Sequence, residues 1–223
     1  MNKIFSLFGV AALCAASASA ASIVIFGTGL SDLNAVLPLG SIDSHYTLVS
    51  QPGATVTPAS NPVRYQNGAY SAPGFTTSGF VSPNASGNAG AGGIYVYQTT
   101  FNIPVGFNPA TASLTGRFAT DNSGFVRLNN GPNLASCGLV CFTTGQDFST
   151  GTGTGFVQGS NTFQVGVNNE GDPTAFRVEF TAAAVLPTGG VPPPVAGVPE
   201  PASAGLLGLG LAAMGFLARR RIV

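Results

Sequence analysis

The 223-residue chain is poor in charge, and this excludes one large class of partners. Charged side chains make up 7% of the sequence, and Lys3 is its one lysine. Between residues 21 and 197, four arginines stand against seven carboxylates, a formal charge of −3 (4 − 7). Because nucleic acid is bound through clustered lysines and arginines, we exclude it as a partner.

Residues that commonly carry catalysis are also scarce. His45 is the one histidine, and with Asp43 and a serine it offers the only constellation for a hydrolase. A single histidine beside a strand more often makes a structural hydrogen bond. No G-x-S-x-G or H-E-x-x-H motif and no carboxylate pair is evident. We therefore predict that the protein is not an enzyme and holds no cofactor.

The N-terminal 20 residues have the composition of a secretory signal. A lysine at position 3 precedes the apolar stretch 4–16, and the small residues Ala18, Ser19 and Ala20 follow. This order predicts a signal peptide over residues 1–20, cut by signal peptidase before Ala21. Cys14 lies inside it, and the leucine before that cysteine argues against a lipoprotein site.

Export leaves Cys137 and Cys141 as the only cysteines of the mature chain, in an oxidising compartment. We predict a local disulfide between them. The rival interpretation, a metal or redox pair, lacks further cysteines for a zinc site and has C-x3-C rather than C-x-x-C spacing.

Long helical patterns are absent before the tail, whereas glycine (31 residues) and proline (16) are abundant. Residues 95–103 alternate between two faces, and so do 114–119, 163–167 and 176–180. We expect further strands at the start of 21–30, near 63–65 and 75–81, and over 125–128. Turns are expected at 121–124, where the chain reverses, at Asn130-Gly131, and over 168–173.

Short strands at such spacing predict an all-β fold, a two-sheet sandwich of jelly-roll type spanning residues 21–185. A β-helix is the other candidate, but no fixed short repeat is present. Residues 186–197 form a Pro/Gly-rich spacer. Within it, LPTGG at 186–190 lacks the residue that an LPxTG sortase signal has between proline and threonine.

The last segment, 198–223, combines three features in a fixed order. Val198, Pro199, Glu200 and Pro201 precede 17 uncharged residues, 202–218, and then come Arg219, Arg220 and Arg221. As a helix, the uncharged run would be about 25 Å long, near the lower limit for spanning a bilayer. The arginines would stay on the cytoplasmic side as a stop. A buried core helix is the alternative.

This order resembles the PEP-CTERM sorting signal of exported bacterial proteins. The resemblance implies that an exosortase, a membrane-embedded cysteine transpeptidase-like enzyme, recognises the tail and cuts it near Pro199-Glu200-Pro201. The protein would then be anchored transiently in the inner membrane before reaching the cell surface or the extracellular space. An exopolysaccharide or biofilm-matrix role is what the family implies.

The body is similar to the β-sandwich domain often found ahead of such tails, and through it to galactose-binding-like jelly rolls. The similarity rests on residues 40–50, 95–131 and 159–180, and it implies carbohydrate binding as the alternative function. Exposed tyrosines would stack the sugar, with Tyr65, Tyr70, Tyr95 and Tyr97 as candidates. Phe80 and Phe118 stand where that family commonly has tryptophan, and this chain has no tryptophan.

Two weaker motifs complete the set. Asp121 and Asn122 offer oxygen ligands for calcium, but the six to eight ligands that calcium takes are not visible, so we predict no metal. Asn84 begins the one glycosylation sequon, Asn84-Ala85-Ser86.

Overall fold

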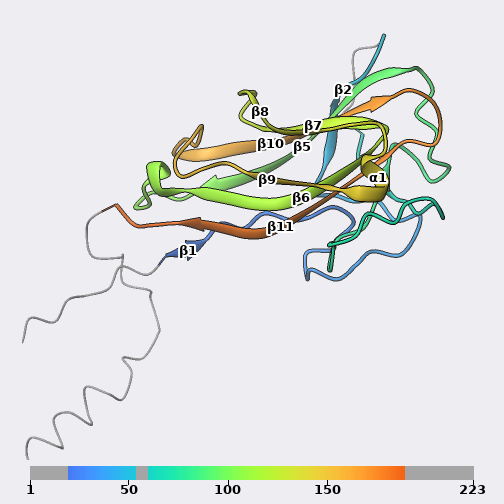
Figure 1. Cartoon of the computed structure of the whole chain (residues 1–223). Coiled ribbons are helices and arrows are strands. Elements are labelled where there is room, and N and C mark those ends of the chain that lie inside the picture. Colours follow the sequence, from blue (N-terminus) through green and yellow to red (C-terminus); the bar gives the residue numbers. More distant parts are fainter. Residues whose placement is uncertain (1–19, 54–59, 189–223) are drawn as a thin grey trace, which may run out of the picture. The chain divides into compact units, whose positions relative to one another are not determined.

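The computed structural model describes residues 20–53 and 60–188, which form two antiparallel β-sheets packed face to face (Figure 1). The six-stranded sheet consists of β1 (Ala21–Ser22), β3 (Val63–Arg64), β4 (Val81–Ser82), β6 (Ser113–Asp121), β9 (Gln146–Ser149) and β11 (Ala175–Val185). The five-stranded sheet consists of β2 (Thr47–Ser50), β5 (Gly93–Ile103), β7 (Ser123–Leu128), β8 (Asn133–Cys137) and β10 (Gly159–Asn169). A 3-10 turn, η1 (Pro109–Thr111), and one helical turn, α1 (Cys141–Thr144), lie in the connections. The predicted all-β two-sheet sandwich is thereby confirmed.

Several predicted features lie outside the described residues. They are the signal peptide through residue 19, including Ala18, the spacer from residue 189, the sorting motif 198–201, the helix over 202–218 and the arginines 219–221. Among the residues that are described, no helix is long and apolar enough to cross a membrane.

Most connections carry the chain from one sheet to the other. The strand orders are β3-β4-β11-β6-β9 and β2-β5-β10-β7-β8, with β1 pairing β11. Within the described ranges, consecutive strands share a sheet only at β3–β4 and β7–β8. The turn expected at 121–124 therefore does not make a hairpin, since β6 and β7 lie in opposite sheets. Alternation fixes which face of a strand is buried, but it does not say which sheet the next strand joins.

The alternation itself predicted the core well. On β5, Tyr95, Tyr97, Thr99, Phe101 and Ile103 are all buried, while the residues between them are exposed or half-buried except for Val96. The neighbouring strand β10 supplies the buried Phe163, and strands β6 and β11 of the other sheet supply the buried Phe118 and Phe176. These positions form one core between the two sheets.

Two expected strands are shorter than predicted, and one expected turn is shifted. The strand at the start of 21–30 is only Ala21–Ser22, and the one near 75–81 is only Val81–Ser82. The β7–β8 turn centres on Asn129 and Asn130, with φ of 48° and 57°, one residue before the expected Asn130-Gly131. Two successive positive φ values are typical of a type I′ hairpin, which asparagine tolerates.

The register places both described ends of the body together. Ala21 pairs with Val185 in antiparallel β1 and β11, so both lie at one end of the sandwich, at the left in Figure 1. The connections 104–112, 129–132 and 150–158 lie at this same end, because β5, β7 and β9 finish there. We call this the terminal end and the opposite one the far end.

Candidate functional site

On the outer face of the five-stranded sheet, an aromatic ring lies over a glycine of a central strand. Val165 and Val167 of β10 are buried, so Gly166 between them faces outward. A Cβ on Gly166 would lie 2.2 Å from ring atoms of Phe125 on β7, which pairs directly with it. The ring therefore covers Gly166. The ring is half-buried, so part of it is an apolar surface open to solvent.

Polar groups continue from this ring across the sheet. The Arg127 guanidinium carbon is 5.4 Å from the Phe125 ring centroid, and Arg127 Nε donates to Gln164 Oε1 (2.6 Å). Gln164 Nε2 in turn donates to Gln98 Oε1 on β5 (2.9 Å). The row fixes the rotamers of three long side chains. Hydroxyl-rich ligands are bound by such amides and guanidinium groups.

A shallow hollow of about 340 Å³ lies on the other side of the ring. Its lining includes Ile94, Ser123, Ser136 and Asn168, together with Phe125 itself. We call the hollow, the ring, Arg127, Gln164 and Gln98 the Phe125 platform. A glycine on the outward face of a predicted strand was the one sequence signal for it, because an interior glycine often marks a close approach.

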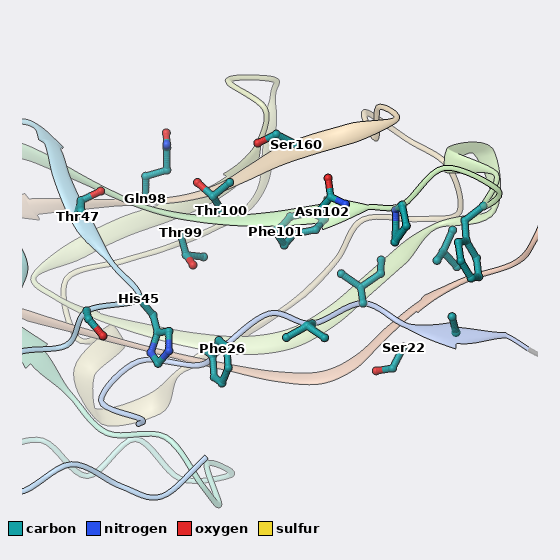
Figure 2. Close-up of a pocket in the computed structure, with 17 residues that line it drawn as sticks. Ser22, Phe26, His45, Thr47, Gln98, Thr99, Thr100, Phe101, Asn102 and Ser160 are labelled. Atoms are coloured by element: carbon teal, nitrogen blue, oxygen red, sulfur yellow. The ribbon is translucent and has the colours of Figure 1, made fainter. Parts of the chain in front are cut away.

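A larger cleft of about 750 Å³ opens at one side of the sandwich, between residues 21–26 and β5. Figure 2 shows Thr99 pointing toward Phe26 and His45, whereas Gln98 and Thr100, which also line the cleft, point to the other side of β5. His45 and Phe26 line its opposite wall. The cleft exists because β2 pairs β5 only as far as Gln98, which leaves 99–103 without a strand on this edge.

His45 is held between two carboxylates at this cleft. Its Nε2 is 2.9 Å from Asp32 Oδ1, and its Nδ1 is 3.5 Å from Asp43 Oδ1. The ring stacks on Phe26 with a centroid distance of 3.9 Å. Burial raises the pKa of the Asp43 carboxyl, against the lowering effect of N–H donation from Gly29 (2.7 Å) and from His45. The arrangement anchors the loop after β1.

The tyrosines expected to bind sugar are not available for it. Tyr70, Tyr95 and Tyr97 are buried, and the half-buried Tyr65 packs edge-on against Tyr70. Their predicted exposure is therefore wrong. The core contains no tryptophan, and tyrosine side chains fill part of its volume beside phenylalanine.

The expected calcium ligands already have protein partners. Asp121 Oδ2 accepts a hydrogen bond from the Tyr70 hydroxyl (2.8 Å), and burial raises the pKa of this carboxyl. Asn122 Oδ1 accepts from the Glu170 N–H (2.8 Å). Among the described residues, no group of three histidine, cysteine or acidic side chains is placed to hold a metal. Asn84 lies in an exposed turn, with its Oδ1 accepting from Ser86.

The predicted disulfide is confirmed. Cys137 and Cys141 are bonded, with their Cα atoms 5.7 Å apart. Cys137 ends β8 of the five-stranded sheet, and Cys141 begins α1, which contacts β6 of the other sheet. The bond fixes the crossover between the sheets at the far end.

A buried carboxylate that sequence reasoning missed organises the outer face of the six-stranded sheet. Glu179 accepts the backbone N–H groups of Thr76, Thr77 and Ser78 and the hydroxyls of Thr76 and Ser78, at 2.6–3.0 Å. Burial alone would raise its pKa, but these donors lower the pKa to about 2. Roughly 100 residues separate the acid from its donors, so no local pattern announces the contact.

The same loop is held by arginine on phenylalanine. Phe75 lies 4.4 Å from the guanidinium carbon of Arg177 and 5.9 Å from that of Arg117. Arg177 Nε also donates to Ser78 Oγ (2.9 Å), and Arg117 pairs with Asp147 (2.5 Å). These arginines serve the fold, which leaves Arg127 as the cation on the opposite sheet's outer face.

A comparison with known families bears on where the chain is sorted in the cell. Residues 197–221 match the PEP-CTERM protein-sorting motif. The PEP-CTERM match includes Pro199-Glu200-Pro201 and the three arginines 219–221, and it confirms the resemblance given by the sequence. It implies an exported protein that an exosortase sorts and that associates with the cell surface. No curated protein and no solved structure matches the chain.

Proposed function

We propose that this chain is a bacterial surface or extracellular-matrix protein with a structural or adhesive role, in an exopolysaccharide or biofilm context. The observation that carries the proposal is the PEP-CTERM match at 197–221 behind a β-sandwich body. Signal peptidase removes residues 1–20. Residues 202–218 then hold the chain in the inner membrane, with the arginines on the cytoplasmic side, until an exosortase cuts near Pro199-Glu200-Pro201.

The body is proposed to be a jelly roll. Its eight central strands run in the order β4-β11-β6-β9 in one sheet and β5-β10-β7-β8 in the other. This is the order made by two Greek keys wound across two sheets, and it supports the assignment. A rigid sandwich of this kind suits a protein that works as a spacer or contact surface.

The role is proposed to be non-catalytic. His45 stacks on Phe26, and its Nε2 bonds to Asp32, contacts that are typical of a structural histidine. Its distance of 3.5 Å to Asp43 is longer than a hydrogen bond. A His45→Ala variant should keep any function in adhesion. A hydrolytic activity that is lost in this variant would overturn the proposal.

The sorting step is tested by the mass of the mature protein. Released or surface-exposed chain should end near Pro199-Glu200-Pro201, and Glu200→Ala should leave the C-terminus intact at Val223. Pro193→Ala, in the spacer, is the matched control and should be processed normally. An intact Val223 in surface-exposed wild-type protein would refute exosortase processing.

Carbohydrate binding is the second candidate function, and the Phe125 platform favours it. A flat ring beside hydrogen-bonding side chains is how proteins bind sugars, with the ring packing against C–H groups and the polar groups bonding hydroxyls. Phe125→Ala should abolish binding on a glycan array. Phe107→Ala, a half-buried phenylalanine of the side cleft, should leave it unchanged. A blank array for wild type leaves the structural role alone.

A further inference from the structure

The terminal end of the sandwich differs from the far end in charge. Its connections 104–112, 129–132 and 150–158, and the last described residues 186–188, contain no Asp, Glu, Lys, Arg or His. At the far end, the connections carry four carboxylates, Asp32, Asp43, Glu170 and Asp172. The charged residue closest along the chain to a terminal-end connection is Arg127, a cation two residues before 129–132. The net charge of −3 between 21 and 197 is therefore distributed unevenly.

Apolar side chains project from this charge-free end. Val105 is 88% exposed, Val157 is 50% exposed and Leu186 is 43% exposed. They belong to three different segments. The far end also exposes aliphatic side chains, such as Leu33 and Leu139, but there they share the surface with the carboxylates. Only the terminal end combines exposed apolar groups with the absence of charge among the described residues.

Hydrogen bonds join these segments into one surface. Asn108 N–H donates to the Leu186 carbonyl (2.8 Å), and Thr188 N–H donates to the Gly106 carbonyl (2.9 Å). Gly153 N–H donates to the Ala112 carbonyl (2.8 Å), and Asn129 Nδ2 donates to the Gly155 carbonyl (2.8 Å). The valines are therefore presented by a fixed framework and not by separate loops.

The chain leaves the body at this end with a short connection to its sorting motif. Ala21 and Val185 lie side by side in β1 and β11. Nine residues, 189–197, lie between Thr188 and Val198, so the chain takes ten residue steps to reach the Val-Pro-Glu-Pro stretch. A chain spans at most about 3.5 Å per residue, so this tether is no longer than roughly 35 Å. While the tail is anchored, this tether keeps the terminal end of the body within roughly 35 Å of the motif at the membrane face.

The geometry points to the terminal end as a membrane-docking surface, which rests on the lipid bilayer while the tail is still uncut. This inference rests on the sorting function proposed above. Carboxylates facing a bilayer lose hydration and are repelled by anionic lipid. The far end would incur this cost with its three exposed acids, Asp32, Glu170 and Asp172, whereas the terminal end presents none; Asp43 is buried. Exposed valine and leucine side chains gain free energy by entering the interfacial region.

The absence of tryptophan from the chain allows a direct test. Chain 21–223, tail included, is reconstituted into phosphatidylethanolamine/phosphatidylglycerol vesicles with brominated acyl chains. Val105→Trp and Val157→Trp report the terminal end. Leu33→Trp and Leu139→Trp, also at exposed positions, are the matched controls at the far end. Phe216→Trp reports insertion of the tail.

We expect brominated lipid to quench tryptophan at 105, 157 and 216, relative to unbrominated vesicles, and to leave 33 and 139 unquenched. Quenching at 216 without quenching at 105 and 157, or equal quenching at both ends, overturns the docking surface but leaves the sorting function intact. A failure to quench at 216 counts against the proposed anchoring itself. If 105 and 157 change only with protein concentration, the surface binds a second copy and the inference is wrong.

Discussion

Replacing Glu179 by glutamine should destabilise the protein at neutral pH and leave it unchanged in strong acid. Glutamine keeps the size of the side chain but removes the charge that the cradle of Thr76, Thr77 and Ser78 stabilises. One of its two acceptor oxygens also becomes an NH2 group that faces N–H donors. The bonds to the loop are weakened at their common acceptor.

The size of the effect follows from the pKa of the carboxyl. Folding lowers that pKa from 4.5 to about 2, and each pKa unit corresponds to about 1.36 kcal/mol. The full difference of about 2.5 units (4.5 − 2) is about 3 kcal/mol. Because water near the edge of the cradle screens the charge, we expect about 2 kcal/mol. Since the folded pKa is the lower one, this stability is present above pH 4.5 and is lost as the pH falls toward 2.

Urea unfolding between pH 2 and pH 7 measures this directly. Wild-type stability should fall as Glu179 is protonated, and the difference between wild type and Glu179→Gln should shrink over the same interval. Glu170→Gln is the matched control, because the Glu170 side chain is exposed and its carboxylate accepts a single hydrogen bond, from Asn168. A Glu179→Gln variant as stable as wild type at pH 7 would refute the cradle. So would a loss that is the same at pH 2 and pH 7.

Three further outcomes follow from contacts elsewhere in the body. Gly166→Ala should cost about 1–3 kcal/mol in urea unfolding, because its Cβ displaces the Phe125 ring. Adding Phe125→Ala to this variant should recover part of that loss. If the double variant instead loses the sum of the two single losses, the contact between Gly166 and Phe125 is contradicted. Replacing both Cys137 and Cys141 by alanine should cost about 2 kcal/mol of loop-closure free energy for a five-residue loop, with an unchanged m-value. A smaller m-value would mean that the crossover is already unfolded in the native state of the variant. Phe75→Leu should cost about 1 kcal/mol through loss of the two guanidinium contacts, and an unaltered midpoint in urea would exclude them as a source of stability.

Strand positions could be predicted from the sequence wherever one face of the strand is buried. On β5 and β10 the period of two identified the core side chains, and the polar run after Asn168 identified the end of β10. The pairing of Cys137 with Cys141 followed from there being no other cysteine in the mature chain. In each case the residues that determine the feature lie close to it in the sequence.

The remaining features depend on contacts between distant parts of the chain. The Glu179 cradle joins residues about 100 apart, and the burial of Tyr70 depends on Phe80, Phe142 and Asp121, which no periodic pattern links to it. The assignment of β6 and β7 to opposite sheets has the same character, because a turn with the residues Asp121–Gly124 serves a hairpin or a crossover equally well. Such features are set by packing and not by local preference.

The proposed membrane-docking surface and the proposed sugar-binding platform are different surfaces of this sandwich, so the two proposals are compatible. The strands run from the terminal end to the far end, and the Phe125 platform lies on the outer face of a sheet between those ends. A body that rests on its terminal end therefore keeps the platform open to the surroundings. If the platform binds glycan, its affinity should be equal in the vesicle-anchored chain and in the chain released after residue 199. A platform that binds only after release would mean that the body lies on its side and that the charge-free end does not orient it.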